Sequence, residues 1–464
     1  MSQITLPATL SALRQRIQTG ELDASTALAT QQALLERHHQ SWQCVTHTFH
    51  STPAGKPELP LAGVGLAHKD LFVVGQRQPY AGAPYNTLHT GSYSPLIRRL
   101  EQAGSHTMAM LSMAEYACGV TGENPHWPRP LNPIDPKAAV GGSSSGSGVA
   151  VAAGLCYGSL GSDTAGSVRI PAATCGVLGL MPTHGVLSTA GTYPLAPSLD
   201  TIGILSRSAL DAAHILHVSL SPRQQDRHFP AAYQHAGLLH LPAIKSLRIA
   251  SCFEHYRAAF TPSDEQLAML EQVAKDYACN ATPTRVDLPA FAELTRASEV
   301  ILHVETAAQH KDKLINTMHP LSDACRTVIH AGAAIPADWY VHAVQTRRQQ
   351  RHAFIQTYFK EHDVLLTPVL PQGIPDWTEV SMLSPHFKPR SLISLFSWTS
   401  FVNYLGLPAI VFPIGTDHTG RPVSVQAIAR PHAEALLLAW AYQVEQDRYG
   451  QHGFIPQPHA LMST

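Results

Sequence analysis

Two runs rich in glycine and serine constrain this chain more than any other feature. The first reads "GGSSSGSGVAVAAG" (141–154) and the second, shortly after it, "LGSDTAGSVRIPAA" (160–173). A flexible linker is one interpretation of the first run taken alone. The small apolar residues that follow favour a helix and a strand packed closely against other backbone, because glycines in such segments mark tight turns or close approach.

Three kinds of loop use such sequences, and their companion residues distinguish them. A phosphate-binding loop is excluded, since no lysine follows the glycines. The G-x-S-x-G pattern of a nucleophile elbow is present at 142–146, but the preceding "NPIDPKAAV" makes a poor central strand, so this interpretation stays a weaker alternative. Serine-based acyl transfer needs a base and backbone N–H donors for the oxyanion, and the successive amides from Thr164 to Ser167 can supply those donors.

A base for such a serine is found in "LAGVGLAHKDLFVV" (61–74), an apolar, strand-like segment that carries Lys69. Burial disfavours the charged form of lysine, and lowering its pKa from about 10.4 to about 7 takes roughly 4 to 5 kcal/mol, which desolvation can supply. A strand-end lysine paired with Asp70 is the structural alternative. None of the 27 histidines stands in a context that singles it out, and the S-x-x-K pattern is absent.

Composition limits the partners and the location. The 464 residues are 44% hydrophobic and carry a formal charge of -1 without long charge runs, which predicts a globular protein that binds neither nucleic acid nor membranes and favours a small neutral substrate. Seven widely spaced cysteines without a C-x-x-C pair predict reduced thiols and a cytoplasmic location. No apolar run is long enough for a membrane span. No H-E-x-x-H and no tight Cys/His cluster is present, so we expect no metal and no other cofactor.

Helix and strand patterns alternate along the chain, which predicts an α/β layer fold. Helices are expected at 7–19, at 25–39 with Ser25 and Thr26 as capping residues, from Pro95 to a stop at Gly104, and at 206–218, 264–278 and 339–359. Strands are expected at 61–74, 106–111, 246–251, 363–368 and 406–415.

Several segments together resemble the amidase signature family, hydrolases with a Ser-cisSer-Lys triad. They are "GVGLAHKDLFVVG", "AEYACGVTGENP", the two runs above, "SLDTIGIL", "LLTPVLP" and "NYLGLPAIVFPIG", in the family's order from near residue 60 to near residue 415. The runs also resemble malonamidase-like members, and "EYACGVTGEN" resembles the biuret and carboxybiuret hydrolases. The resemblance implies one domain over 1–464: a large mixed β-sheet covered by helices on both faces, with a signature core at about 60–210 and 360–430 and a mostly helical cap at about 210–360.

The family's lysine falls on Lys69, its cis-serine on Ser143 and its nucleophile on Ser167. The resemblance implies that Lys69 takes a proton from Ser143, which takes one from Ser167, and that a cis peptide joins Gly142 to Ser143. It assigns the oxyanion hole to the backbone amides of Thr164, Ala165, Gly166 and Ser167, and supporting roles to Gly142, Ser144, Asp163 and Arg169.

The implied activity is hydrolysis of a small carboxamide, or of a related carbamate or urea-type C–N bond, by way of an acyl-enzyme and water. The alternatives are the glutaminase (A-type) subunit of a tRNA-dependent amidotransferase and, less favoured, a non-catalytic scaffold protein of the same fold. A homodimer is a possible assembly. Two departures from the family pattern predict altered pocket surroundings or packing: "AMLSM" (109–113) replaces Gly-Lys-Thr-Asn-Met, and Met181 replaces the lysine of "GLKPT".

Overall fold

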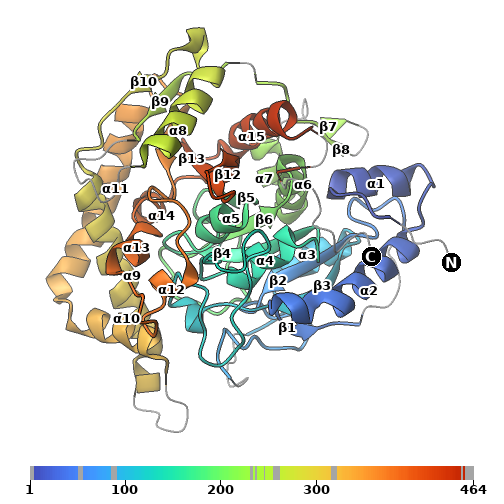
Figure 1. Ribbon diagram of the computed structural model, residues 1–464, viewed down its shortest axis with the longest axis horizontal. Coiled ribbons are helices and arrows are strands. Elements are labelled where there is room, and N and C mark those ends of the chain that lie inside the picture. Colours follow the sequence, from blue (N-terminus) through green and yellow to red (C-terminus); the bar gives the residue numbers. More distant parts are fainter. Residues whose placement is uncertain are drawn as a thin grey trace.

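The computed structural model describes residues 5–50, 56–84, 91–229, 234–235, 238–244, 246–253, 262–314, 321–450 and 453–454 (Figure 1). The described strands form three sheets, of eight, three and two strands. No helix in these ranges is both long enough and apolar enough to cross a membrane. The two larger sheets supply the strands that end at the predicted site residues.

The eight-stranded sheet is mixed. In spatial order its strands are β10 (Thr284–Arg285), β9 (Ile249–Ser251), β11 (Val364–Pro368), β13 (Pro422–Ala429), β12 (Ala409–Thr416), β5 (Leu178–Met181), β6 (Thr201–Ser206) and β4 (Gly158–Asp163). β9 pairs in parallel with β10 and with β11, and the other neighbouring pairs are antiparallel. The edge strand β4 leads directly into the nucleophile segment predicted from the second glycine run.

A smaller sheet holds Lys69. Its strands are β1 (Val45–Thr48), β3 (His106–Leu111) and β2 (Gly65–Lys69), with β3 in the centre, antiparallel to β1 and parallel to β2. All of β2 is buried, and Lys69 is its last residue. The Leu160 amide of β4 donates to His68 Nδ1 at 3.2 Å, so β2 meets the edge of the large sheet. The third sheet pairs β7 (Gln234–His235) with β8 (Leu238–Leu239).

Helices cover both faces of the large sheet (Figure 1). Along β12, Ile410 and Phe412 share a buried cluster with Trp440, whereas Val411 shares one with Ile170. Because successive side chains of a strand point to opposite faces, the helices of Trp440 and Ile170 lie on opposite sides. The α-helices are α1 (Leu10–Gln18), α2 (Ala24–Trp42), α3 (Pro95–Gln102), α4 (Ser145–Ala152), α5 (Arg169–Cys175), α6 (Ala209–Ser219), α7 (Pro222–His228), α8 (Asp264–Tyr277), α9 (Phe291–Leu314), α10 (Asp323–Ala334), α11 (Ala337–Tyr358), α12 (Trp377–Val380), α13 (Pro389–Ser394), α14 (Ser400–Leu405) and α15 (Glu434–Arg448), and two 3-10 helices are η1 (Glu115–Ala117) and η4 (Cys279–Ala281).

The expected fold class, a large mixed sheet with helices on both faces, is confirmed. One capping prediction is wrong: the second helix begins at Ala24, and Asp23 caps it by accepting from the Thr26 amide at 2.9 Å. A capping side chain must precede the helix it caps, which excludes Ser25 and Thr26. The strand expected at 61–74 is shorter, since only β2 pairs with a neighbouring strand.

Part of the segment 210–360 belongs to the core. α6 packs on β6, α8 packs on β12 and β13, and β9 and β10 are strands of the large sheet. α9 packs against α10, α11 and α14, and these helices lie together beside the sheet (Figure 1). Residues 230–233, 236–237, 245, 254–261 and 315–320 of this segment lie outside the described residues. The single domain with a helical cap stays a prediction, and the cap is narrowed to α9, α10 and α11.

Candidate active site

Lys69 and Ser143 meet in the buried space between the two larger sheets. Lys69 is 0% exposed, and its Nζ donates to Ser143 Oγ at 2.7 Å and to Ser162 Oγ at 2.9 Å. The alternative of a Lys69–Asp70 ion pair is wrong, because Asp70 pairs with Arg77 at 2.8 Å. Apart from the Ser162 carbonyl at 3.5 Å, the partners of Lys69 are therefore hydroxyl groups, which can exchange protons with it, rather than a carboxylate that would hold its charge.

Burial lowers the pKa of Lys69 from 10.5 to about 7, while Asp200 and Asp163 act in the opposite direction. A substantial fraction of the molecules therefore carries an uncharged amine near neutral pH. Only the uncharged amine has a lone pair that can accept a proton. The contact between Lys69 and Ser143 thus has the chemistry of a general base and its proton donor.

The first glycine run turns so that Ser143 faces Lys69. The peptide between Gly142 and Ser143 is cis, as the family resemblance implies. A side chain on Gly142 would meet the carbonyl oxygen of Gly119 at 2.8 Å, so the close backbone approach expected of this run is present. The Ala114 amide donates to the Ser143 carbonyl at 3.2 Å and fixes the turn from the other side.

Ser144 joins the two runs and brings Ser167 beside Ser143. Its amide donates to the Ser167 carbonyl at 3.2 Å, and its Oγ donates to the Ser162 carbonyl at 3.3 Å. Ser167 is 6% exposed, whereas Ser143 is 0% exposed. Within the described ranges, Ser167 Oγ forms no hydrogen bond, and none joins it to Ser143 Oγ. The backbone therefore places the two serines next to each other, and Ser167 is the one that solvent reaches.

The four amides expected to form the oxyanion hole differ in their hydrogen bonds. The Gly166 amide donates to Asp163 Oδ1 at 2.8 Å, so it is engaged with that carboxylate in this structure, and its part in the oxyanion hole stays a prediction. The amides of Thr164, Ala165 and Ser167 donate no hydrogen bond to any residue that the structure describes. Three donors therefore remain for an oxyanion.

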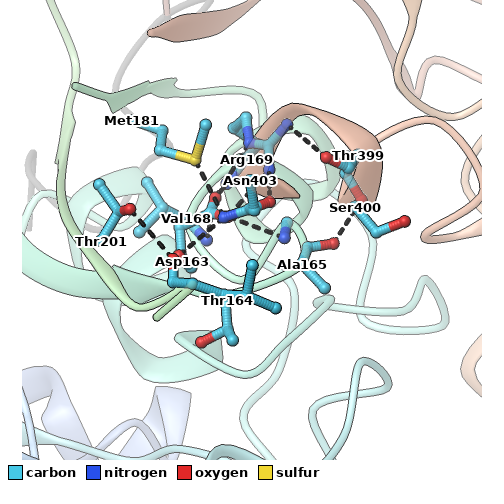
Figure 2. Close-up of polar contacts among 12 residues, drawn as sticks. Asp163, Thr164, Ala165, Val168, Arg169, Met181, Thr201, Thr399, Ser400 and Asn403 are labelled. Carbon is cyan, nitrogen blue, oxygen red and sulfur yellow. Dashed lines mark hydrogen bonds and ion pairs between the residues drawn. The ribbon is translucent and has the colours of Figure 1, made fainter. Parts of the chain in front are cut away.

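Asp163 and Arg169 form an ion pair at 2.9 Å behind this loop (Figure 2). Arg169 also donates to Asn403 Oδ1 at 2.6 Å and to Gln426 Oε1 at 2.7 Å, and Asn403 Nδ2 donates to Asp163 Oδ1 at 2.9 Å. Burial raises the pKa of Asp163, but the Arg169 guanidinium and the hydrogen bonds from Asn403 and the Val168 amide together hold that pKa below its usual range. These contacts hold the loop backbone from behind, at the positions where the sequence predicted supporting residues.

The departures from the family pattern lie in the core. Met181 is buried, and its Sδ accepts from Asn403 Nδ2 at 3.2 Å (Figure 2). Met110, inside the "AMLSM" segment, is also buried and pairs with His68 across β3 and β2. The departures therefore alter packing behind the site.

Sequence reasoning missed four polar residues of the site. Ser162 contacts Lys69, and Asp200 Oδ1 accepts from Thr164 Oγ1 at 2.7 Å. Both stand inside quoted segments, as does Asn403, so a search for polar residues within those segments would have found them. Gln426 lies outside all of them, and its only sequence signal is an amide within a mostly apolar strand.

Among the described residues, one group has the composition of a metal site. Ligand atoms of His228, His432 and Glu434 all lie within 4.8 Å of one another. One Glu434 oxygen accepts from the Thr183 amide at 2.8 Å and from Thr183 Oγ1 at 2.6 Å, and the other lies 2.6 Å from His228 Nδ1. These hydrogen bonds engage both carboxylate oxygens of Glu434. They explain why His228 lies close to Glu434 at the buried start of α15.

Comparison with known proteins identifies the family. The chain belongs to the amidase family, whose model, described as Amidase, matches residues 20–438. The protein is therefore an amidohydrolase that acts on amide or urea-type C–N bonds. AtzE of Pseudomonas sp. (strain ADP), one of the subunits of 1-carboxybiuret hydrolase, is 33% identical over 398 residues, 84% of each chain.

Two further matches show how broad the similarity is. The A-type subunit of the glutamyl-tRNA(Gln) amidotransferase of Prochlorococcus marinus (strain MIT 9303) is 31% identical over 436 residues, 87% of this chain and 88% of that one. A crystal structure of an amidase superposes with a TM-score of 0.79 at 25% identity, covering 95% of this chain and 99% of that one. Amidases and amidotransferase subunits therefore resemble this chain at similar levels of identity.

Proposed function

We propose that this protein hydrolyses small carboxamides, or related carbamate and urea-type bonds, with Lys69, Ser143 and Ser167 as a Ser-cisSer-Lys triad. Neutral Lys69 accepts the proton of Ser143, Ser143 accepts that of Ser167, and Ser167 Oγ attacks the carbonyl carbon. The leaving nitrogen receives the proton back along the same relay as the C–N bond breaks. Water then attacks the acyl-enzyme, and the acid is released.

The negative charge that forms on the carbonyl oxygen requires donors. We assign this role to the amides of Thr164, Ala165 and Ser167, while the Gly166 amide keeps its bond to Asp163. Losing one such donor typically costs about 10²- to 10³-fold in turnover. No step of this mechanism needs a metal or an organic cofactor.

The observation that carries the proposal is the 2.7 Å contact between the wholly buried Lys69 Nζ and Ser143 Oγ. A base with a pKa of about 7 is matched to proton transfer near neutral pH. Similarity to one of the carboxybiuret hydrolase subunits supports urea-type bonds among the substrates.

Covalent labelling tests the nucleophile. A serine-directed fluorophosphonate is expected to add once to the parent protein and not to Ser167→Ala, as measured by intact mass. Ser188→Ala is the matched control, since this serine is exposed and lies outside the site, and it should keep the label. A labelled Ser167→Ala protein, or an unlabelled parent, contradicts the proposal.

The glutaminase subunit remains the second candidate, because identity to the A-type amidotransferase chain reaches 31%. Such a glutaminase needs partner subunits and a route for ammonia. Hydrolysis of simple aryl amides by the purified chain alone would favour the amidase. Glutamine hydrolysis that appears only with partner subunits would favour the alternative. The cytoplasmic location and the homodimer stay predictions.

A further inference from the structure

Apart from the proposed triad, four side chains form a compact cationic group, the Lys313 cluster: Lys313, His310, Tyr193 and Tyr116. Lys313 Nζ lies 5.0 Å from the ring centroid of Tyr116 and 5.3 Å from that of Tyr193. It donates to Tyr193 Oη at 2.5 Å and lies 3.3 Å from His310 Nδ1. The rings of the two tyrosines and the histidine lie 5.1 to 5.5 Å apart.

The cluster carries a positive charge without a carboxylate partner. In the described ranges, Lys313 contacts a phenol, two aromatic faces and an imidazole, and forms no ion pair. Burial, helped by Lys313, lowers the pKa of His310 to about 3, so the imidazole is neutral. Burial also raises the pKa of Tyr193 and Tyr116, so both phenols are neutral. Burial lowers the pKa of Lys313, while the nearby Asp312 acts in the opposite direction. A partly desolvated cation without an ion-pair partner is costly, and such groups concentrate at functional sites.

The cluster has more hydrogen-bond donors than its own contacts engage. The Lys313 ammonium has three protons, each of the two tyrosines has one, and neutral His310 has one on Nε2, which makes six donors. Within the cluster, Tyr193 Oη accepts from Lys313, and His310 Nδ1 accepts from either Lys313 or Tyr193 at 3.3 Å. Four donors and one positive charge therefore remain, which is the complement of an anionic oxygen group such as a carboxylate.

Short stretches of chain connect the cluster to the proposed triad. Tyr116 stands two residues after Ala114, whose amide donates to the Ser143 carbonyl at 3.2 Å. The Tyr193 amide donates to the Leu71 carbonyl at 2.9 Å, just beyond the end of β2. The aromatic rings thus project from the segments that position the relay serine and its lysine.

We propose that the Lys313 cluster is a subsite for a carboxylate on the substrate, so that the protein acts on amides or ureas that carry a carboxylate at their far end. This inference rests on the proposed function. It revises the neutral substrate expected from a net charge of -1, since that value describes the whole chain and not one pocket. A single cation matches the single charge of a carboxylate rather than the double charge of a phosphate.

Paired substrates test the subsite. Succinamate and glutaramate carry the carboxylate at two spacings, and 4-methylpentanamide and 5-methylhexanamide are their neutral counterparts. The measured quantity is the ratio of kcat/KM for the acid to that for its neutral counterpart. Lys313→Met is expected to lower this ratio by about 10- to 100-fold, mainly through KM, as loss of a charged hydrogen bond does. Lys313→Arg keeps the charge and should restore most of the ratio.

Lys311→Met is the matched control, because Lys311 is exposed on the same helix, and it should leave the ratio unchanged. An unchanged ratio in Lys313→Met overturns the subsite, even if both activities fall together. A better rate with 3-phosphonopropanamide than with succinamate overturns the assignment to a carboxylate.

A binding measurement separates this inference from the proposed function. Calorimetry with butyrate, which the protein cannot hydrolyse, should give a heat of binding that is lost in Lys313→Met and kept in Ser167→Ala. Suppose that Lys313→Met loses butyrate binding and that fluorophosphonate does not label the parent protein. That outcome would refute the triad and retain the subsite. Equal butyrate binding in the parent and Lys313→Met would overturn the subsite alone.

Discussion

Two buried cations lie on opposite faces of one strand, and they differ in their partners. Ser162 and Asp163 are consecutive at the end of β4, so their side chains point in opposite directions. Ser162 contacts Lys69, whereas Asp163 forms the ion pair with Arg169. Both cations are 0% exposed.

The partners decide what each cation can do. Hydroxyl groups do not offset the desolvation of Lys69, so its pKa falls to about 7 and its proton becomes mobile near neutral pH. The carboxylate of Asp163 compensates the charge of Arg169, and the side-chain oxygens of Asn403 and Gln426 and the Thr399 carbonyl accept from its remaining donors. One cation is therefore suited to proton transfer and the other to holding the loop.

Replacing the first cation should have the largest effect. Lys69→Met keeps the bulk of the side chain but removes the base, so kcat/KM for a neutral amide is expected to fall by about 10²- to 10⁴-fold. The folded state should not be weakened, because it no longer desolvates an amine. Steady-state hydrolysis and urea denaturation measure the two effects. Activity within tenfold of the parent would rule out Lys69 as the base.

The second cation should respond in the opposite way. Asp163→Asn leaves Arg169 buried without a counter-charge, and breaking a buried pair in this manner costs about 3 to 5 kcal/mol of unfolding free energy. Asp323→Asn, in an exposed pair with Arg326, is the control and should cost less than about 1 kcal/mol. Urea denaturation measures both variants. A loss of stability for Asp163→Asn no larger than the control's would show that Arg169 is held by its amide partners alone.

The sequence indicated the segments that meet at the candidate site because local chemistry determines these backbones. A strand-like segment that ends in Lys69 and glycine runs around Ser143 and Ser167 specify where the chain turns, whatever surrounds them. The hydrogen bond between the Gly166 amide and Asp163 was not predictable, since it depends on the way one carboxylate folds back over its own loop.

Long-range pairing set the other limits of prediction. Asn403 on α14 and Gln426 on β13 reach Arg169 from more than two hundred residues away, because β12, which follows α14 in the chain, pairs with β5, and β13 pairs with β12. That strand order has no local signature. The same reason explains why part of the predicted cap is core: β9 joins the sheet only through its pairing with β11.

The smallest effect is expected from removing the hydroxyl of Ser162, which contacts Lys69 and directly precedes Asp163 on β4. Activity should rise with pH as Lys69 loses its proton, with a midpoint of about 7. Ser162 Oγ accepts from Lys69 Nζ at 2.9 Å and so favours the charged form. Ser162→Ala should therefore lower the pKa of Lys69 and move the acid limb of the kcat/KM profile to lower pH, by up to about one unit.

The direction of that shift is informative. Profiles from pH 5 to 9 on a neutral amide measure it, with Ser188→Ala as the unshifted control. A limb that stays in place would mean that the 2.9 Å contact does not discriminate between the two states of Lys69. A limb that moves to higher pH would mean that Ser162 donates to the neutral amine. It would then compete with Ser143 for the lone pair on which the relay depends.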